Sequence, residues 1–196
     1  MKHMALVIAS TLMIGGCFEA KEPDKGLAQA TKNVETTEVS SNSPDVTVKS
    51  WWRVKDAGVV MYIEACKGYM RAEAPYLAKL AELSTPEIYN GRECPKIPDT
   101  YDRQITKVDV QSDTRAVVMA RIRNTTPPDE GAALTEEEKS RKESGEAYQY
   151  VLERKDSSSD WKIAQVSNMP SWARDWQVVF KKPEPSTNRW VFEHQQ

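Results

Sequence analysis

The hydrophobic period of the chain changes once, near residue 99, and this change constrains the fold more than any other feature. Before it, apolar residues recur at steps of three and four, which predicts amphipathic helices over residues 51–69 and 72–83. Ser50 is the expected N-cap of the first helix, and Pro75 falls in the first turn of the second. Thr85-Pro86 has the pattern of a cap and a first helical residue, closed by Asn90-Gly91.

After residue 99, apolar and polar side chains alternate with period two, as they do in half-buried strands. The alternation predicts four strands, at residues 105–110, 115–123, 148–153 and 161–166. The polar run 156–160 separates the last two strands and predicts a hairpin loop. Helices followed by antiparallel strands indicate an α+β fold, with the N-terminal helices packed on the sheet.

A polar insertion, residues 126–145, separates the second and third predicted strands. It contains the sequence TEEEKSRKE, in which Thr135 could cap a short charged helix. We interpret this charge run as a solvated face, with a binding role as the alternative.

The first 17 residues combine Lys2 and His3 with an apolar run of eleven residues, which is too short to span a bilayer. The run ends in Ile14-Gly15-Gly16-Cys17, which resembles the lipobox of bacterial lipoproteins. The resemblance implies a signal peptide over residues 1–16 and diacylglycerol and acyl chains, such as palmitate, on Cys17. It places the protein in the cell envelope, facing the periplasm. Phe18, where retained lipoproteins usually carry Asp, favours the outer membrane over the inner one.

Residues 18–45 are rich in Glu, Lys, Ser, Thr and Asn, so we expect residues 17–45 to form a lipidated N-terminus and a disordered linker. The structured domain is then expected over residues 46–196. An exported chain meets an oxidising compartment, so the two remaining cysteines, Cys66 and Cys94, are predicted to form a disulfide bond.

Two segments of the domain resemble the nuclear transport factor 2-like (SnoaL-like) superfamily. They are VVMYIEACKG, residues 59–68, in the first long helix, and Trp161-Lys162-Ile163 in a late strand. The resemblance covers about residues 50–169 and implies a long helix across a curved sheet, forming a cone with an apolar mouth. A different α+β sheet protein is the alternative.

The C-terminal extension, residues 170–196, lies beyond that pattern and is rich in large aromatic residues. It carries Trp172, Trp176, Phe180, Trp190 and Phe192. Aromatic residues in a terminal segment indicate either that the segment packs back on the domain or that it offers a surface to a protein partner.

The net charge and the motifs of the sequence argue against several classes of function. A net charge of −2 argues against nucleic acid as the partner. Nucleotide-binding, zinc-protease and serine-hydrolase motifs are absent from the sequence, and His194 is the only histidine beyond the predicted signal peptide. We therefore expect no catalytic residues, no cofactor and no metal site.

The leading hypothesis is a lipid-anchored envelope protein whose domain binds a protein or a small apolar ligand without catalysis. The candidate binding residues are Tyr148, Tyr150, Trp172 and Trp176. Arg121 and Arg123 could also point inward, although we expect surface arginines and core tyrosines. The alternatives are an immunity protein that neutralises an exported toxin, a small isomerase- or dehydratase-like enzyme, and an accessory protein of secretion or assembly.

Overall fold

Three helices precede the strands, and a fourth helix is inserted between the second and third strands. The computed structural model describes residues 25–68, 73–85, 94, 97–128 and 130–181. Its elements in chain order are α1 (Lys25–Thr36), α2 (Pro44–Lys67), α3 (Ala74–Leu83), β1 (Tyr101–Ser112), β2 (Arg115–Asn124), α4 (Glu136–Ser144), β3 (Glu146–Glu153), β4 (Lys162–Met169) and β5 (Gln177–Lys181). The predicted α+β fold, with its antiparallel sheet, is confirmed.

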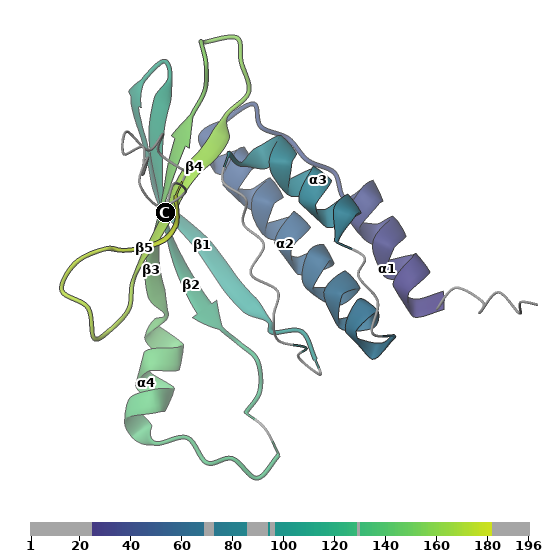
Figure 1. Ribbon diagram of the computed structural model, residues 1–196. Helices are drawn as coiled ribbons and strands as arrows, with labels where there is room; N and C mark the ends of the chain where they lie inside the picture. Colours follow the sequence, from purple (N-terminus) through teal and green to yellow (C-terminus); the bar gives the residue numbers. More distant parts are fainter. Residues whose placement is uncertain (1–24, 69–72, 86–93, 95–96, 129, 182–196) are drawn as a thin grey trace, which may run out of the picture.

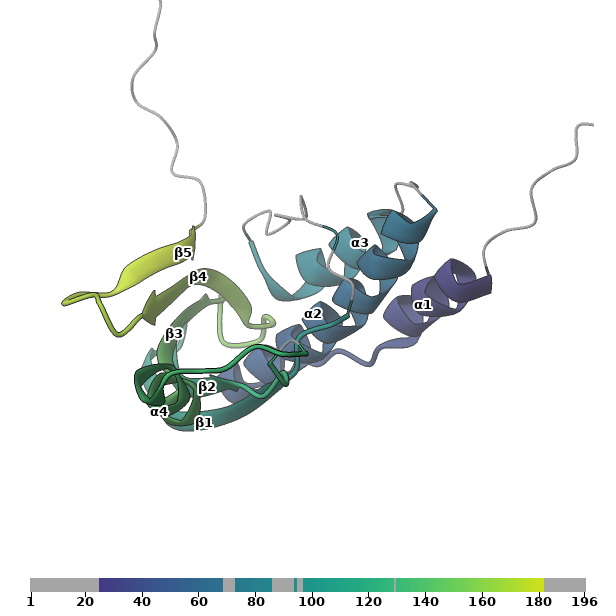
Figure 2. The same ribbon diagram turned by 90° about the horizontal axis from the view of Figure 1, so that it is seen from below.

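The strands form one sheet in the order β1-β2-β3-β4-β5, with every neighbouring pair antiparallel. Helices α1, α2 and α3 pack together on one side of this sheet, with α2 and α3 in contact with it and α1 on their far side, and α4 extends from one end of the sheet (Figure 1). The strands follow a curved path from β1 to β5 (Figure 2). Bulges in the β1–β2, β3–β4 and β4–β5 ladders accompany this curvature, since a bulge bends its strand and increases the local twist.

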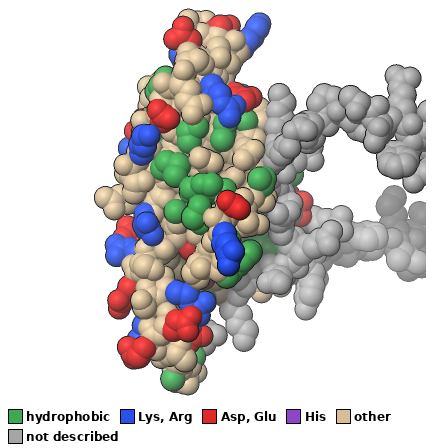
Figure 3. All heavy atoms as spheres, turned by 90° about the vertical axis from the view of Figure 1, so that its left-hand side faces the viewer, with side chains coloured by type: hydrophobic (Ala, Val, Ile, Leu, Met, Phe, Trp, Pro, Cys, Tyr) green, Lys and Arg blue, Asp and Glu red, His purple; other side chains and the backbone are tan. Residues whose placement is uncertain are grey.

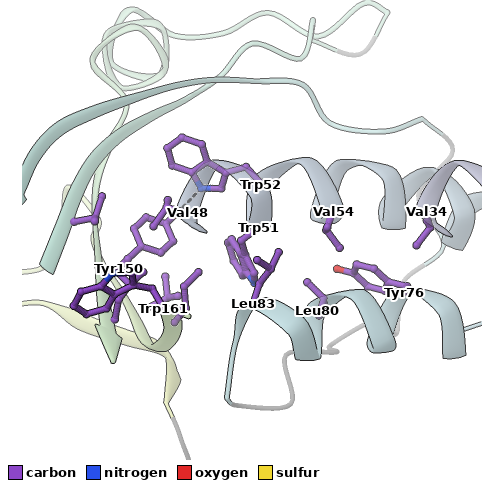
Figure 4. Packing of buried hydrophobic residues seen from close by; sticks show 14 of the residues in the cluster. Val34, Val48, Trp51, Trp52, Val54, Tyr76, Leu80, Leu83, Tyr150 and Trp161 are labelled. Carbon is purple, nitrogen blue, oxygen red and sulfur yellow. Dashed lines mark hydrogen bonds between the residues drawn. The ribbon is translucent and has the colours of Figure 1, made fainter. Parts of the chain in front are cut away.

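The hydrophobic core lies between α2 and the inner face of the sheet and continues between the helices (Figure 4). Trp52 donates a hydrogen bond from its indole Nε1 to the hydroxyl of Tyr150, at 2.8 Å. The indole of Trp51 meets the same tyrosine ring edge-on, with the ring centroids 5.8 Å apart. Alternate residues of β2 face this core: Ala116, Val118 and Ala120. The period-two alternation therefore identified the buried face of the sheet correctly.

Helix α1 corrects the expectation of a disordered linker over residues 17–45, which is wrong for residues 25–36. Leu27, Ala30 and Val34 recur at steps of three and four and are all buried in the core. This narrow apolar stripe packs on α2 and α3, and the polar residues that suggested disorder cover the rest of the helix. The preceding residues, 1–24, lie outside the described part of the chain, together with the proposed signal peptide and Cys17.

Helix α2 begins seven residues before the predicted start, with Ser43 as its N-cap and Pro44 in its first turn. The N-cap prediction for Ser50 is wrong, because this residue is buried inside the helix. Its hydroxyl accepts hydrogen bonds from the backbone N–H of Ser40 and from the guanidinium of Arg53. Pro44 is the feature that marks the true start, since proline is favoured in the first helical turn.

The remaining elements follow the predictions closely, with one strand added. Four strands, the 156–160 loop and a helix capped by Thr135 occur where they were expected. Strand β5 lies within the C-terminal extension, and Phe180 packs against the core, so this part of the extension packs back on the domain. The helix suggested by Thr85-Pro86 falls on residues 86–93, outside the described residues.

Cys66, near the end of α2, and Cys94 lie at disulfide-bonding distance, with 5.8 Å between their Cα atoms. This separation is compatible with the predicted bond. Within the described residues, no helix has both the length and the apolar character needed to cross a membrane.

Replacing Gly58 by alanine is expected to lower the free energy of unfolding by up to about 2 kcal/mol. Alanine in a helix is worth about 1 kcal/mol over glycine, but the added Cβ would collide with the ring of Tyr76, which packs directly on Gly58. Overpacking of this kind costs about 1–3 kcal/mol and should outweigh the gain in propensity. Urea denaturation followed by circular dichroism measures the change.

The matched control combines Gly58→Ala with Tyr76→Leu, which removes the ring edge. If the close approach is real, the two substitutions together cost less than the sum of the single effects. A stabilised Gly58→Ala variant would contradict the packing of α3 on α2.

Candidate functional site

An open pocket of about 790 Å³ lies at the end of the sheet from which α4 extends. Helix α4, the ends of β2 and β3, and the loop after β4 form its walls. Its volume is within the range that binds small molecules or an anchoring side chain of a partner. The aromatic residues of the lining are Tyr101, Tyr148 and Trp172, and the charged ones are Arg121, Glu138, Arg141, Lys142 and Glu146.

Local sequence signals place α4 beside the pocket. Thr135 and Glu138 form a capping box, in which the Thr135 hydroxyl accepts from the Glu138 N–H and the Glu138 carboxylate accepts from the Thr135 N–H. The helix ends at Gly145, whose φ of 63° suits glycine, and the chain then turns directly into β3. A Cβ at Gly145 would also crowd the backbone of Ile122, so this tight turn holds α4 against the end of β2.

Tyr148 and Tyr101 form the aromatic floor of the pocket. The Tyr148 ring stacks on the buried ring of Tyr150, at 6.5 Å between centroids. Burial and the neighbouring Glu146 carboxylate raise the pKa of Tyr148. Burial, reinforced by Asp99, raises the pKa of Tyr101 to about 12. Both phenols therefore stay protonated at neutral pH. The Tyr101 hydroxyl donates its proton to Asp99, so Tyr148 is the phenol that can donate to a ligand.

Arg103 fixes Tyr101 from the helical side of the sheet. Its guanidinium makes two hydrogen bonds to Asp56 of α2, at 2.6 and 2.7 Å, and lies 5.0 Å from the Tyr101 ring centroid. It also lies over the ring of Trp52, at 5.8 Å. A cation over an aromatic face is attractive, so this arrangement links the pocket floor to the core.

Several charged groups of the lining are already engaged with the protein. Arg121 donates to the carbonyl oxygens of Ser144 and Gly145, both at 3.3 Å, and Lys142 donates to the carbonyl of Thr126. Glu146 accepts a hydrogen bond from the side chain of Asn168. These bonds hold the pocket walls together. Among the described residues, Arg141 forms only a loose ion pair with Glu137, at 4.0 Å, and is the lining cation most free to meet a ligand.

The structure brings two of the four predicted binding residues together and separates the other two. Tyr148 and Trp172 line the same pocket, and Trp172 is 76% exposed at its rim. Tyr150 is 1% exposed and belongs to the core, so its prediction as a binding residue is not supported by its position. Trp176 is half-buried just before β5 and is not part of the pocket lining.

The predicted surface role of the arginines fits the structure. Arg123 is exposed and forms an ion pair with Asp102 across the β1–β2 ladder. Arg121 is exposed on the same outer face of the sheet. Figure 3 shows the sheet from the side away from the helices, where charged side chains surround a central group of apolar ones.

Sequence reasoning missed Tyr101 and treated the residues of α4 mainly as a solvated face. Tyr101 precedes the alternating run that marked the first strand, so no local signal distinguished it. Its place in the pocket depends on the pairing of Tyr101 with Asn124, a contact that the sequence does not reveal. For Arg141 and Lys142, the capping signal at Thr135 was visible, but the side of the helix that meets the sheet was not.

Within the described residues, the structure contains no cluster of three or more metal-ligating side chains. In the same part of the chain, no aspartate or glutamate is buried. The hydrogen bond from the Tyr101 hydroxyl to Asp99, at 3.2 Å, is solvent-exposed.

Comparison with known proteins adds no relative: no family model matches the chain, and no curated protein and no solved structure shows significant similarity to it.

Proposed function

We propose that the chain is a lipid-anchored protein of the bacterial cell envelope, and that its α+β domain binds a protein partner through the pocket beside α4. The observation that carries the binding role is the exposed indole of Trp172 at the rim of an aromatic pocket. Tryptophan and arginine are the residues that most often dominate the free energy of protein–protein binding. An indole with three-quarters of its surface in water has a large area to gain by such a contact.

The periplasmic location and the lipid on Cys17 rest on the resemblance of residues 1–17 to a lipoprotein signal. The outer membrane is the proposed site because Phe18 follows the cysteine. We also propose cone-like packing of the nuclear transport factor 2-like type. The curved path of the strands and the long helix α2 against their inner face support it.

Binding without catalysis is part of this proposal, and a small apolar ligand in the pocket is its closest variant. The pocket offers the Tyr148 hydroxyl as a donor, the Tyr101 ring, an indole and the Arg141 guanidinium around an opening. Such a set recognises an extended protein segment that presents a carboxylate beside an apolar side chain.

The lipid anchor predicts complete loss of fatty-acid labelling in Cys17→Ala. Cells grown with an alkyne analogue of palmitate should label the wild-type chain, and mass spectrometry should find its mature N-terminus at an acylated Cys17. The matched control, Cys66→Ala with Cys94→Ala, removes the other two cysteines and should keep the label. Persistent labelling of Cys17→Ala, or an unacylated mature N-terminus, would rule out the anchor.

The binding role predicts site-specific photocrosslinking in intact cells. A benzophenone amino acid placed at position 172 of the full chain should give one discrete protein adduct. The same probe at Lys155, exposed in the β3–β4 loop at the other end of β3, should give none. Arg141→Glu should weaken the adduct at 172, because it reverses the freest charge of the pocket. Equal adduct patterns at 172 and 155 would count against the pocket as the binding site.

Once the partner is purified, Trp172→Ala should lower its affinity by about 30-fold, the effect of losing a contact worth about 2 kcal/mol. Trp176→Ala is the matched control, since this tryptophan lies outside the pocket lining.

A further inference from the structure

Strand β1 is the outermost strand of the sheet, and it carries two exposed valines in a mostly polar sequence. Among the described residues, only β2 pairs with it. Val108 and Val110 are 42% and 59% exposed. Their cross-strand partners on β2, Val118 and Ala116, are fully buried. The helical layer therefore covers β2 and stops short of this part of β1, which leaves two valines uncovered beside the core.

The opposite face of the same segment carries an unused pair of charges. Lys107 and Asp109 lie across from Met119 and Val117 on β2. Neither side chain takes part in any of the ion pairs of the described residues. Other charges along the strand are engaged: Asp102 pairs with Arg123, and Arg103 pairs with Asp56.

We propose that a second copy of this chain pairs with the free edge of β1, antiparallel and centred on Val108. In this register Val108 faces Val108 of the other copy, and Lys107 faces its Asp109 on both sides of the two-fold axis. Thr106 and Val110 also face each other. The unused charges thus become two cross-strand ion pairs, and the two Val108 side chains pair on the helical face.

The charges select this register over its neighbours. A dimer centred on Lys107 would place the two lysines directly opposite each other. A dimer centred on Asp109 would place two carboxylates directly opposite each other. A register with the axis between two residues is excluded by geometry. It would oppose odd- and even-numbered residues, which point to opposite faces of the sheet, whereas opposed residues of an antiparallel pair share a face. Only the pairing centred on Val108 satisfies both charges, and it also brings the two Val108 side chains together.

The bulges of β1 limit the length of this contact. They lie between Ile105 and Lys107 and between Val110 and Ser112, so the regular part of the strand is residues 107–110. Bulges and lysines are also features that prevent unspecific pairing of edge strands. A short regular run with self-complementary charges therefore favours a specific and reversible dimer over open-ended aggregation.

Cysteine crosslinking of the full chain in its membrane tests the register. Val108→Cys should form a disulfide-linked dimer under mild oxidation, detected on a non-reducing gel. Val110→Cys is the matched control, on the same face and more exposed. The cysteine at position 110 of the other copy lies four residues along the opposing strand, about 13 Å away. This distance is too great for a disulfide. We expect the dimer band of Val108→Cys to be roughly tenfold stronger, whereas random collisions would favour the more exposed Val110→Cys.

Charge reversal in the Val108→Cys background tests the ion pairs. Lys107→Asp and Asp109→Lys should each weaken the dimer by about tenfold, because each turns two attractive pairs into repulsive ones. Coexpression of the two variants should restore crosslinking between them, since aspartates then face lysines. Carrying both substitutions on one chain should restore it as well.

Three results would overturn the proposal. They are equal crosslinking of Val108→Cys and Val110→Cys, no crosslinking of either, and a crosslinked species whose mass shows a different protein on β1. Circular dichroism of each variant confirms that the fold is intact. The crosslinking result does not depend on the pocket or on the lipid anchor. The dimer proposal can therefore fail while the proposed function holds, and the reverse.

Discussion

Replacing Tyr150 by alanine is expected to lower the free energy of unfolding by about 3–5 kcal/mol, as truncation of a buried aromatic side chain does. Tyr150 is 1% exposed, and its ring meets Trp51, Trp52 and Tyr148. Its loss removes the contact between β3 and the N-terminal half of α2. Chemical denaturation followed by tryptophan fluorescence measures the effect.

Tyr150→Phe separates the hydroxyl from the ring. This variant keeps the packing but leaves the Trp52 Nε1–H, which is buried, without its acceptor. The expected cost is about 1–3 kcal/mol. Pairing Tyr150→Phe with Trp52→Phe removes donor and acceptor together, so the hydroxyl's effect should shrink in that background. A Tyr150→Phe variant as stable as the wild type would contradict the hydrogen bond.

Breaking the Cys66–Cys94 bond is expected to cost about 3.6 kcal/mol. This value is the chain-entropy contribution of a crosslink closing 28 residues. The double variant Cys66→Ala with Cys94→Ala should unfold at a correspondingly lower urea concentration than the oxidised wild type.

Reduction of the wild-type chain supplies the control, since it breaks the same crosslink without changing side-chain volume. The reduced wild type and the double variant should be similarly destabilised. Free thiols at both positions in protein taken from the cell envelope would show that the bond does not form there.

The sequence alone was sufficient to predict four of the five strands of the sheet but not the limits of the helices. Ala116, Val118 and Ala120 lie at alternate positions and form the core-facing side of β2, although Val117 between them is also buried. The short strand Gln177–Lys181 offers too few alternations to be recognised. Its aromatic neighbours indicated only that the segment packs back on the domain or meets a partner. Its pairing with β4 is a tertiary effect.

Helix α1 was missed for a different reason. Its three buried residues occupy one narrow stripe, and the surrounding lysines, threonines and glutamate lower the average hydrophobicity of the segment. Composition therefore predicted disorder, whereas the spacing of Leu27, Ala30 and Val34 indicated a helix. The prediction at Ser50 failed similarly, because a serine before two tryptophans resembles a cap when the earlier signal of Ser43-Pro44 is overlooked.

The pocket was predictable only in part. Tyr148 and Trp172 were identified as aromatic residues that a ligand could meet, and both line it. Tyr150 was predicted to bind a ligand together with Tyr148, because the two residues lie on the same face of one strand. Helix α2 buries Tyr150 and leaves Tyr148 at the end of the core. That difference depends on where Trp51 and Trp52 pack, which residue spacing does not specify.

The position of α1 shortens the tether that connects the domain to the membrane. With a lipid on Cys17, as proposed, only residues 18–24 separate the anchor from the first residue of α1, Lys25. Fully extended, this link reaches about 28 Å, and an unrestrained coil of that length averages about 16 Å. A lipid on Cys17 would thus confine the domain to a thin layer above the lipid headgroups. Two copies in one leaflet would be held at the same height and would meet by lateral diffusion. A partner that is not anchored there would have to approach the membrane surface.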